Sequence, residues 1–163
     1  EMVEAVAIAY FQQERQQHEN FTEESTDAID EILRILQWSM ETFEKMSPNL
    51  ILEAEKFYPK VWKHFEQFQQ EYLLMKIRQN LEWGFLEGLY RQELDVEIVS
   101  RIRLTQVIQS LTQSSFLPAK FKQTDIQRVS LDLYLHSILS PKGLKIFQQR
   151  TNQRDKESNI AHQ

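Results

Sequence analysis

The chain has 163 residues and a mass of 19.6 kDa, which is enough to bury one core and short for two domains. It has no cysteine, which excludes disulfides, thiolate metal sites and a cysteine nucleophile. Its net charge of −5, with basic residues scattered along the sequence, disfavours unaided binding to DNA.

The chain contains only three glycines and four prolines, and this composition predicts an all-α fold. Its longest apolar run, residues 5–11, is far too short for a membrane span, and no leader precedes it. We therefore expect a cytoplasmic protein with no membrane partner. The first residue, Glu1, is not methionine, so we expect a processed chain or a fragment of a longer one.

Apolar spacing predicts two amphipathic helices in the first third of the chain. The first carries Val3, Ala7, Tyr10 and Phe11 on one face. The second is expected to begin at Thr22, as its cap, and to end before 47–49. Its apolar stripe consists of Ile29, Ile32, Leu33, Leu36, Met40 and Phe43, with Trp38 at the edge.

A short helix over 50–57 and a long central helix over 59–88 are predicted next. Tyr58-Pro59 separates them, because the residue before proline avoids the α region while proline suits a first helical turn. Gly88 is expected to cap the long helix with a positive φ, and Gly84 to admit the close approach of another helix.

The next two predicted helices each have two apolar faces. One, over 95–114, begins with Asp95 at the positive end of its dipole, and the other begins with a Thr124-x-x-Gln127 capping box. Their first faces consist of Ile98, Val99 and Ile102, and of Ile126, Val129 and Leu133. Their second faces consist of Leu104, Val107, Ile108 and Leu111, and of Leu131, Leu135, Ile138 and Leu139.

Two apolar faces need two partners, so one face can pack on the chain's own core and the other on a second subunit. Burial of both faces inside the monomer is the alternative, but the interior of a chain of this length is limited. We therefore predict a homodimer through an intermolecular helix bundle and assign its interface to the second faces. A short closing helix after Ser140 ends the domain at 149, and the polar tail 150–163 is expected to fray.

No catalytic or metal-binding pattern is visible in the sequence. None of the four histidines follows a glutamate by three residues, so the Glu-x-x-His pair of di-iron bundles is missing. Asp132 and His136 share a helical face and are interpreted as a surface ion pair or hydrogen bond. No phosphate loop, dinucleotide turn or nucleophile elbow appears. We predict neither an enzyme nor a cofactor or metal.

Aromatic side chains are abundant and lie among polar ones. A helical bundle lined in this way can enclose an apolar pocket with a few polar anchors. Any single aromatic residue is better explained as core, but as a group they favour a pocket. The residues predicted to bind a ligand are Trp38, Tyr58, Trp62, Phe65, Trp83, Arg103 and Gln106.

The stretch GFLEGLYR at 84–91, followed by DVEIVSR at 95–101, resembles the C-terminal regulatory domain of TetR-type transcriptional regulators. KFYPKVW at 56–62 and SPKGL at 140–144 extend the resemblance over 1–147. It implies an all-helical domain that binds a small effector and dimerises through the last two long helices of each subunit. It also implies an N-terminal helix-turn-helix domain, absent from this chain, that binds the operator. The first helix would connect the two domains.

The sequence thus predicts the effector-binding and dimerisation domain of a TetR-type regulator, which couples small-molecule binding to operator release. The effector is expected to be a small apolar or aromatic molecule, and DNA is bound only through the absent domain. The alternative is a stand-alone dimeric helical interaction protein whose aromatic residues only fill the core.

Overall fold

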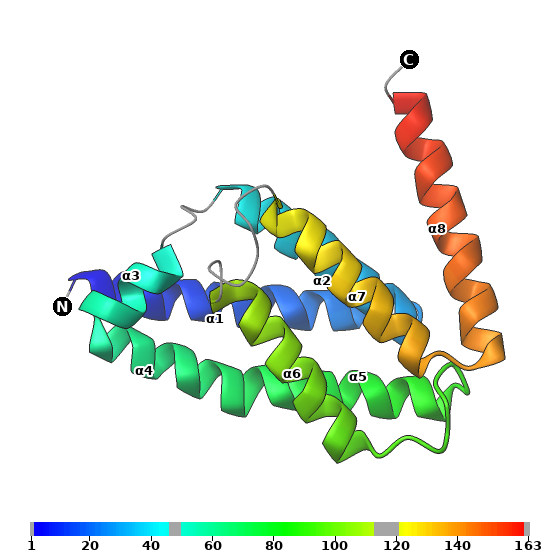
Figure 1. Cartoon of the computed structure of the whole chain (residues 1–163), viewed down its shortest axis with the longest axis horizontal. Helices are drawn as coiled ribbons and strands as arrows, with labels where there is room; N and C mark the ends of the chain where they lie inside the picture. Colours follow the sequence, from blue (N-terminus) through cyan, green and yellow to red (C-terminus); the bar gives the residue numbers. More distant parts are fainter. Residues whose placement is uncertain (1, 46–49, 113–120, 162–163) are drawn as a thin grey trace.

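The computed structural model describes residues 2–45, 50–112 and 121–161, with side chains described for 2–42, 53–110 and 121–153. It is an all-α multi-helix bundle, as predicted (Figure 1). In the described parts of the chain, the one pairing of extended backbone is an isolated antiparallel bridge between Tyr90 and Leu139. No helix in these parts combines the length and apolarity that crossing a membrane requires.

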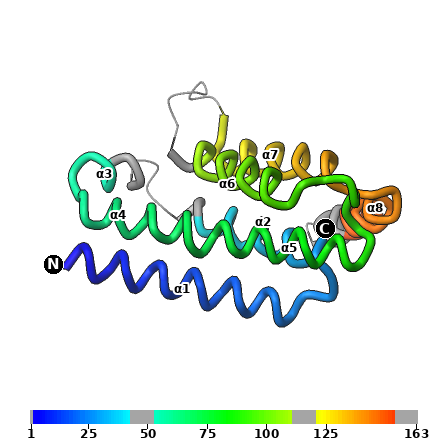
Figure 2. Tube along the Cα trace, turned by 90° about the horizontal axis from the view of Figure 1, so that it is seen from below, coloured from blue at the N-terminus to red at the C-terminus, as the bar shows by residue number. Residues whose placement is uncertain are grey.

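The helices form three layers, which Figure 2 shows from the side. Helix α1 forms one outer layer, α2, α4 and α5 the middle one, and α6 with α7 the other outer layer. Helix α8 lies at one end and projects from the bundle (Figure 1). The elements are α1 (Met2–Glu24), α2 (Ala28–Lys45), α3 (Leu50–Phe57), α4 (Pro59–Gln67), the π-helical turn η1 (Phe68–Leu73), α5 (Leu74–Leu86), α6 (Val96–Thr112), α7 (Gln123–Ile138) and α8 (Pro141–Ala161).

The start of the second helix differs from the prediction. Helix α1 continues past Thr22, and Asp27 caps α2 instead, because its Oδ1 accepts hydrogen bonds from the N–H groups of Ile29 (3.0 Å) and Asp30 (2.9 Å). Threonine and aspartate are both good N-caps, so the residue types alone do not choose between two candidates so close in sequence. The predicted end of this helix, at 47–49, lies outside the described residues.

The predicted long helix consists of α4, η1 and α5, joined without a break. Pro59 occupies its first turn after Tyr58, as expected. Gly88 has a φ of 71° after the end of α5, which confirms the predicted C-terminal cap. A Cβ at Gly84 would overlap the ring of Tyr90. This glycine therefore makes room for an aromatic ring from the next turn of chain and not for another helix.

The two outer helices α6 and α7 begin differently. Asp95 caps α6 by accepting a hydrogen bond from the N–H of Ile98 at 2.9 Å, as predicted. Helix α7 begins at Gln123 after Lys122, which makes no capping bond through its side chain. Thr124 therefore lies inside the first turn, and the predicted capping box is wrong.

The apolar faces of α6 and α7 are exchanged relative to the prediction. The faces assigned to a second subunit pack inside the chain, where α7 contacts α2 and α6 contacts α5. Buried there are Leu104, Leu131, Leu135, Ile138 and Leu139, while Val107 and Ile108 are half-buried. The side chain of Leu111 lies outside the described residues. The exposed apolar residues on these two helices are Ile98, Ile102, Val129 and Leu133, each more than half exposed.

Helix α8 is longer than predicted and continues to Ala161. Arg150, the first residue of the predicted frayed tail, donates a hydrogen bond from Nη1 to Oδ1 of Asp27 at 2.6 Å. This ion pair joins α8 to the start of α2, and the helical backbone extends through most of the segment expected to fray.

Candidate ligand-binding cavity

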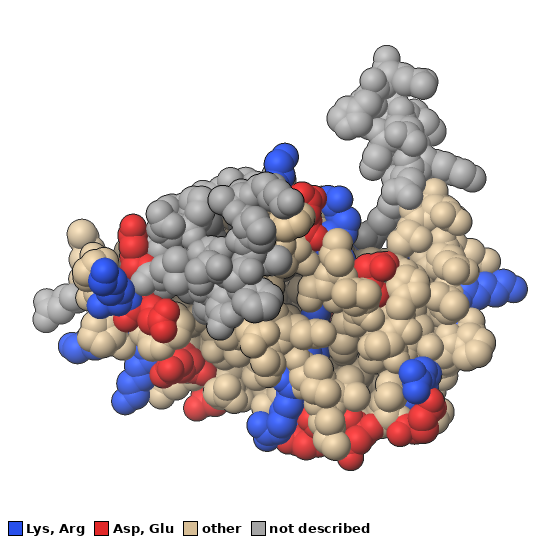
Figure 3. Space-filling view, viewed as in Figure 1, with Lys and Arg blue, Asp and Glu red and all other residues tan. Residues whose placement is uncertain are grey.

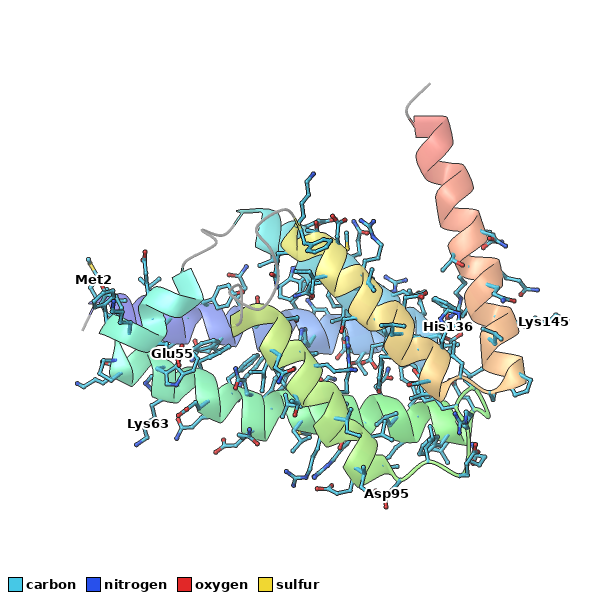
Figure 4. The ribbon with its side chains drawn as sticks, in the orientation of Figure 1. Met2, Glu55, Lys63, Asp95, His136 and Lys145 are labelled. Atoms are coloured by element: carbon cyan, nitrogen blue, oxygen red, sulfur yellow. The ribbon has the colours of Figure 1, made fainter. Side chains whose placement is uncertain are left out.

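A cavity of about 590 Å³ lies inside the bundle, between α1 and the other two layers of helices. Every helix from α1 to α7 contributes to its wall. Val3 and Val6 line it and are 43 % and 65 % exposed, so the cavity opens to solvent at the N-terminal end of α1. Met2 and Glu55 are labelled at this end in Figure 4.

Aromatic and aliphatic side chains form most of the wall. Phe11 of α1 stacks against Phe65 and Phe68, with ring centroids 6.0 Å and 5.1 Å apart. Trp62 contacts Phe65 with centroids 5.2 Å apart. The aliphatic part of the wall includes Ala7, Ile32, Ile35, Leu36, Val61, Leu73, Ile77 and Leu131. Such a surface suits the apolar body of a small molecule.

Four residues of the predicted ligand site line this cavity: Tyr58, Trp62, Phe65 and Arg103. The first three lie on the segment that starts the central helix, and Arg103 reaches the cavity from α6. They approach the same space from different layers of the bundle. The structure therefore brings Arg103 close to residues that precede it by 38 to 45 positions in sequence.

The other three predicted residues are placed elsewhere. Trp38 packs edge-on against His18 and Phe21, with centroids 5.6 Å and 6.1 Å away. Trp83 packs against the main core cluster near the end of α5. Gln106 is not part of the cavity wall, and its Oε1 is buried without a hydrogen-bond partner in the described part of the chain.

A polar ladder on α1 was missed in the sequence. Tyr10, Glu14 and His18 follow one another at intervals of four residues and all line the cavity. Residues four apart lie on one helical face, so this spacing could have identified the ladder. Tyr10 also directly precedes the apolar residue Phe11, which places the start of this polar row next to the apolar face of the helix.

Glu14 is a partly buried carboxylic acid in the cavity wall. The Tyr10 hydroxyl hydrogen-bonds to its carboxyl group. Burial raises the pKa of Glu14 to about 7, and the hydrogen bond from Tyr10 opposes that rise. Burial, together with the charge on Glu14, also raises the pKa of Tyr10. Glu14 can therefore be neutral or charged near neutral pH.

His18 presents a neutral ring to the cavity. Burial, together with the charge on Lys76, lowers the pKa of His18 to about 4. The ring stacks on Tyr72 with centroids 6.0 Å apart. Its Nδ1 is buried without a hydrogen-bond partner in the parts of the chain described here. The imidazole is therefore uncharged at neutral pH.

A buried polar network lies where α2 meets α5. Lys76, which is 6 % exposed, lies 3.8 Å from Oε1 of Glu31 through its Nζ. Asn80 donates from Nδ2 to the other Glu31 oxygen at 2.6 Å and accepts from the Tyr90 hydroxyl at 2.9 Å. Lys76 and Asn80 also line the cavity. Their partners satisfy them, so this wall is polar but already paired.

Arg103, unlike Lys76, contacts an aromatic ring and not an acidic side chain. Its guanidinium carbon lies 4.7 Å from the centre of the Tyr134 ring, which is a cation–π contact. Burial lowers the pKa of Arg103, although a guanidinium keeps its proton at neutral pH. It forms no ion pair with any carboxylate among the described residues.

Among the described residues, a second pocket of about 710 Å³ lies at the end of α5, lined by residues such as Gly88, Arg91 and Ser140, and it is more open to solvent than the cavity. No group of His, Asp and Glu side chains suited to a metal ion occurs in the part of the chain that is described. The Asp132–His136 pair lies on the surface, with His136 Nδ1 3.4 Å from Asp132 Oδ1, as predicted. Acidic and basic side chains are interspersed along the lower edge of the visible face in Figure 3, and neither sign forms a large patch on its described part. The cavity is therefore the main candidate for function.

Comparison with known proteins gives no relative. No family model, curated protein or solved structure matches the chain.

Proposed function

We propose that this chain is the effector-binding and dimerisation domain of a TetR-type transcriptional regulator, which couples the binding of a small molecule to operator release. The observation that carries the proposal is the cavity of about 590 Å³ with mainly apolar walls. Sites for small molecules commonly have volumes of about 300–1,000 Å³ and few polar groups. The resemblance in sequence supports the same reading.

Helix α1 is the element through which binding would be coupled to DNA. It supplies cavity residues from Val3 to His18, along most of its length. A ligand that fits one position of α1 better than another shifts the balance between the two positions. In a dimeric regulator this changes the separation of two DNA-binding heads, which then no longer match successive major grooves.

The exposed face of α6 and α7 supports the dimerisation part of the proposal. Ile98 and Ile102 on α6, and Val129 and Leu133 on α7, are 54–65 % exposed. The two helices pack side by side in the outer layer (Figure 2). A second copy placed on this layer would cover these side chains and complete a four-helix bundle.

Thermal denaturation with a panel of small apolar and aromatic compounds tests the ligand site. A compound that occupies the cavity raises the melting temperature in proportion to its occupancy. Ala7→Phe fills part of the cavity from α1 and is expected to abolish the shift. Ala5→Phe, on the exposed side of the same helix, is the matched control and is expected to keep it.

Two results would contradict the proposal. If no compound stabilises the protein, or if Ala7→Phe and Ala5→Phe respond alike, the cavity is not the ligand site and the stand-alone interaction protein becomes the better explanation. Coupling is tested separately, by the operator affinity of the full-length regulator with and without a bound compound. Unchanged affinity would exclude operator release as the response.

A further inference from the structure

Two cations line the cavity among the described residues, and only one of them has a counter-ion. Lys76 lies 3.8 Å from Glu31 and 3.7 Å from Glu19, and its Nζ donates to the Thr22 hydroxyl at 2.6 Å. Arg103 has the Tyr134 ring and no carboxylate. The positive charge of Arg103 is therefore available to a ligand.

The side chains around Arg103 leave its positive charge without an acidic partner among the described residues. The ring of Tyr134 balances part of the positive charge but offers no oxygen to the five N–H donors of the guanidinium. Val107 and Leu131, also on the cavity wall, are apolar. A partly buried cation without an acidic partner is costly, and an anion that pairs with it reduces that cost.

The acids on the wall belong to other parts of the cavity. Glu14 is on α1, where the Tyr10 hydroxyl hydrogen-bonds to it, and Glu53 is on α3. None of the ion pairs among the described residues joins either acid to Arg103. A guanidinium close to Glu14 would lower the pKa of its carboxyl group, whereas burial raises that pKa and Arg103 is not among its causes. A ligand can therefore reach the guanidinium without displacing an acid of the protein.

We propose that the cavity binds an amphipathic monocarboxylate, with its carboxylate on Arg103 and its hydrocarbon or aromatic body against Phe11, Trp62 and Phe65. This rests on the proposed function, because it assumes that the cavity is the effector site. A guanidinium pairs well with the two oxygens of a carboxylate.

The single cation also selects the charge of the ligand. One guanidinium neutralises one negative charge, which a carboxylate carries. A phosphate monoester carries about −1.5 to −2 at neutral pH, and its excess charge would remain unpaired inside a mainly apolar space. A neutral apolar ligand would leave Arg103 without acceptors. The chemistry of the wall therefore favours a monoanion.

The test is a series of three ligands with one hydrocarbon chain and different head groups: decanoate, decanol and decylammonium. Calorimetric titration of the protein, below the micelle concentration of each ligand, measures the three affinities. Charge-assisted hydrogen bonds predict that decanoate binds about tenfold tighter than decanol, or more. Decylammonium is expected to bind weakest, because its charge has the same sign as that of Arg103.

Two variants locate the head group. Arg103→Gln is expected to lose the preference for decanoate while still binding decanol. Arg101→Gln makes the same charge change two positions away on α6, at an exposed side chain, and is expected to keep the preference. If Arg103→Gln does not fold, Arg103→Lys takes its place. Arg103→Lys keeps the charge and is expected to favour decanoate with a smaller ratio, because it lacks the planar fork.

The outcomes separate this inference from the proposed function. If decanol or decylammonium binds the unmodified protein as tightly as decanoate, or if Arg103→Gln keeps the preference, the carboxylate site is wrong while an apolar ligand site stands. If none of the three ligands binds while another compound stabilises the protein through the cavity, the carboxylate site is wrong and the proposed function stands; if no compound of either set binds, both fail.

Discussion

Glu14 links the cavity to pH. Its pKa is raised to about 7 from an ordinary value of 4.5, so between these values the folded protein binds a proton that the unfolded chain does not. The free energy of unfolding therefore falls as pH rises through this window, by up to about 3 kcal/mol from this group. Glu14→Gln removes the effect, so the variant gains stability relative to the unmodified protein between pH 5 and pH 8.

Urea denaturation at the two pH values measures this difference. His18 has the opposite effect, because its pKa is lowered to about 4 and its contribution to stability is lost as pH falls through 6.5. It is present in both proteins, so its effect cancels in the comparison. Glu55→Gln, at an exposed residue of α3, is the control. Equal pH dependence in Glu14→Gln and the unmodified protein would contradict the placement of Glu14.

Lys76 is expected to matter for stability more than any exposed lysine. Replacing it with methionine leaves Glu31, which is 2 % exposed, without its cation. Removing one partner of a buried ion pair costs about 3–5 kcal/mol. Lys63→Met makes the same change at an exposed position of α4, labelled in Figure 4, and is expected to cost less than about 0.5 kcal/mol. Urea denaturation compares the two variants, and equal losses would contradict the argument.

At the scale of elements, spacing predicted where helices lie better than which way they face. The break at Tyr58-Pro59 and the cap at Gly88 follow from the backbone chemistry of proline and glycine, and both are confirmed. The π-helical turn inside the central helix was not predicted. It widens the helix over a single turn, which leaves the apolar pattern on each side almost unchanged.

The helices α6 and α7 show the limit of periodicity. Each has two apolar faces of similar size, and nothing within one helix says which face the rest of the chain will cover. The prediction assigned Leu135 and Ile138 to a partner, whereas α2 and the core bury them. The choice between faces is made by contacts between elements that are distant in sequence.

The sequence predicted an apolar pocket, but it identified only some of the residues that line the cavity. Trp62 and Phe65 share a helical turn and both line it, whereas Trp38 and Trp83 pack elsewhere. An aromatic residue at the edge of an apolar stripe can fill a core or line a space, and its local sequence is the same in both cases. Glu14 is one of several acidic residues on α1, and its residue type does not distinguish an acid on the cavity wall from one exposed to solvent.

At the scale of the whole molecule, the exposed face of α6 and α7 predicts the oligomeric state. Replacing Ile102 and Leu133 together with glutamate puts charge at the centre of the proposed dimer contact. The particle is then expected to change from twice the chain mass of 19.6 kDa to that mass. Analytical ultracentrifugation measures the change. The core residues of both helices are untouched, so the fold is expected to persist.

The matched control is Leu86→Glu. Leu86 is 89 % exposed but lies at the end of α5, outside the face formed by α6 and α7. This variant is expected to remain a dimer. A monomeric unmodified protein, or dissociation caused equally by Leu86→Glu, would contradict the proposed contact surface.

The cavity can form only late in folding, because its wall combines residues that are distant in sequence. Its residues extend from Val3 to Tyr134, so the first and the seventh helices must both be in place before the space exists. Contacts this distant in sequence form late, because a long stretch of chain must be closed to make them. We therefore expect that a nascent or partly folded chain cannot bind the proposed effector. Binding would become possible only once the whole bundle has assembled.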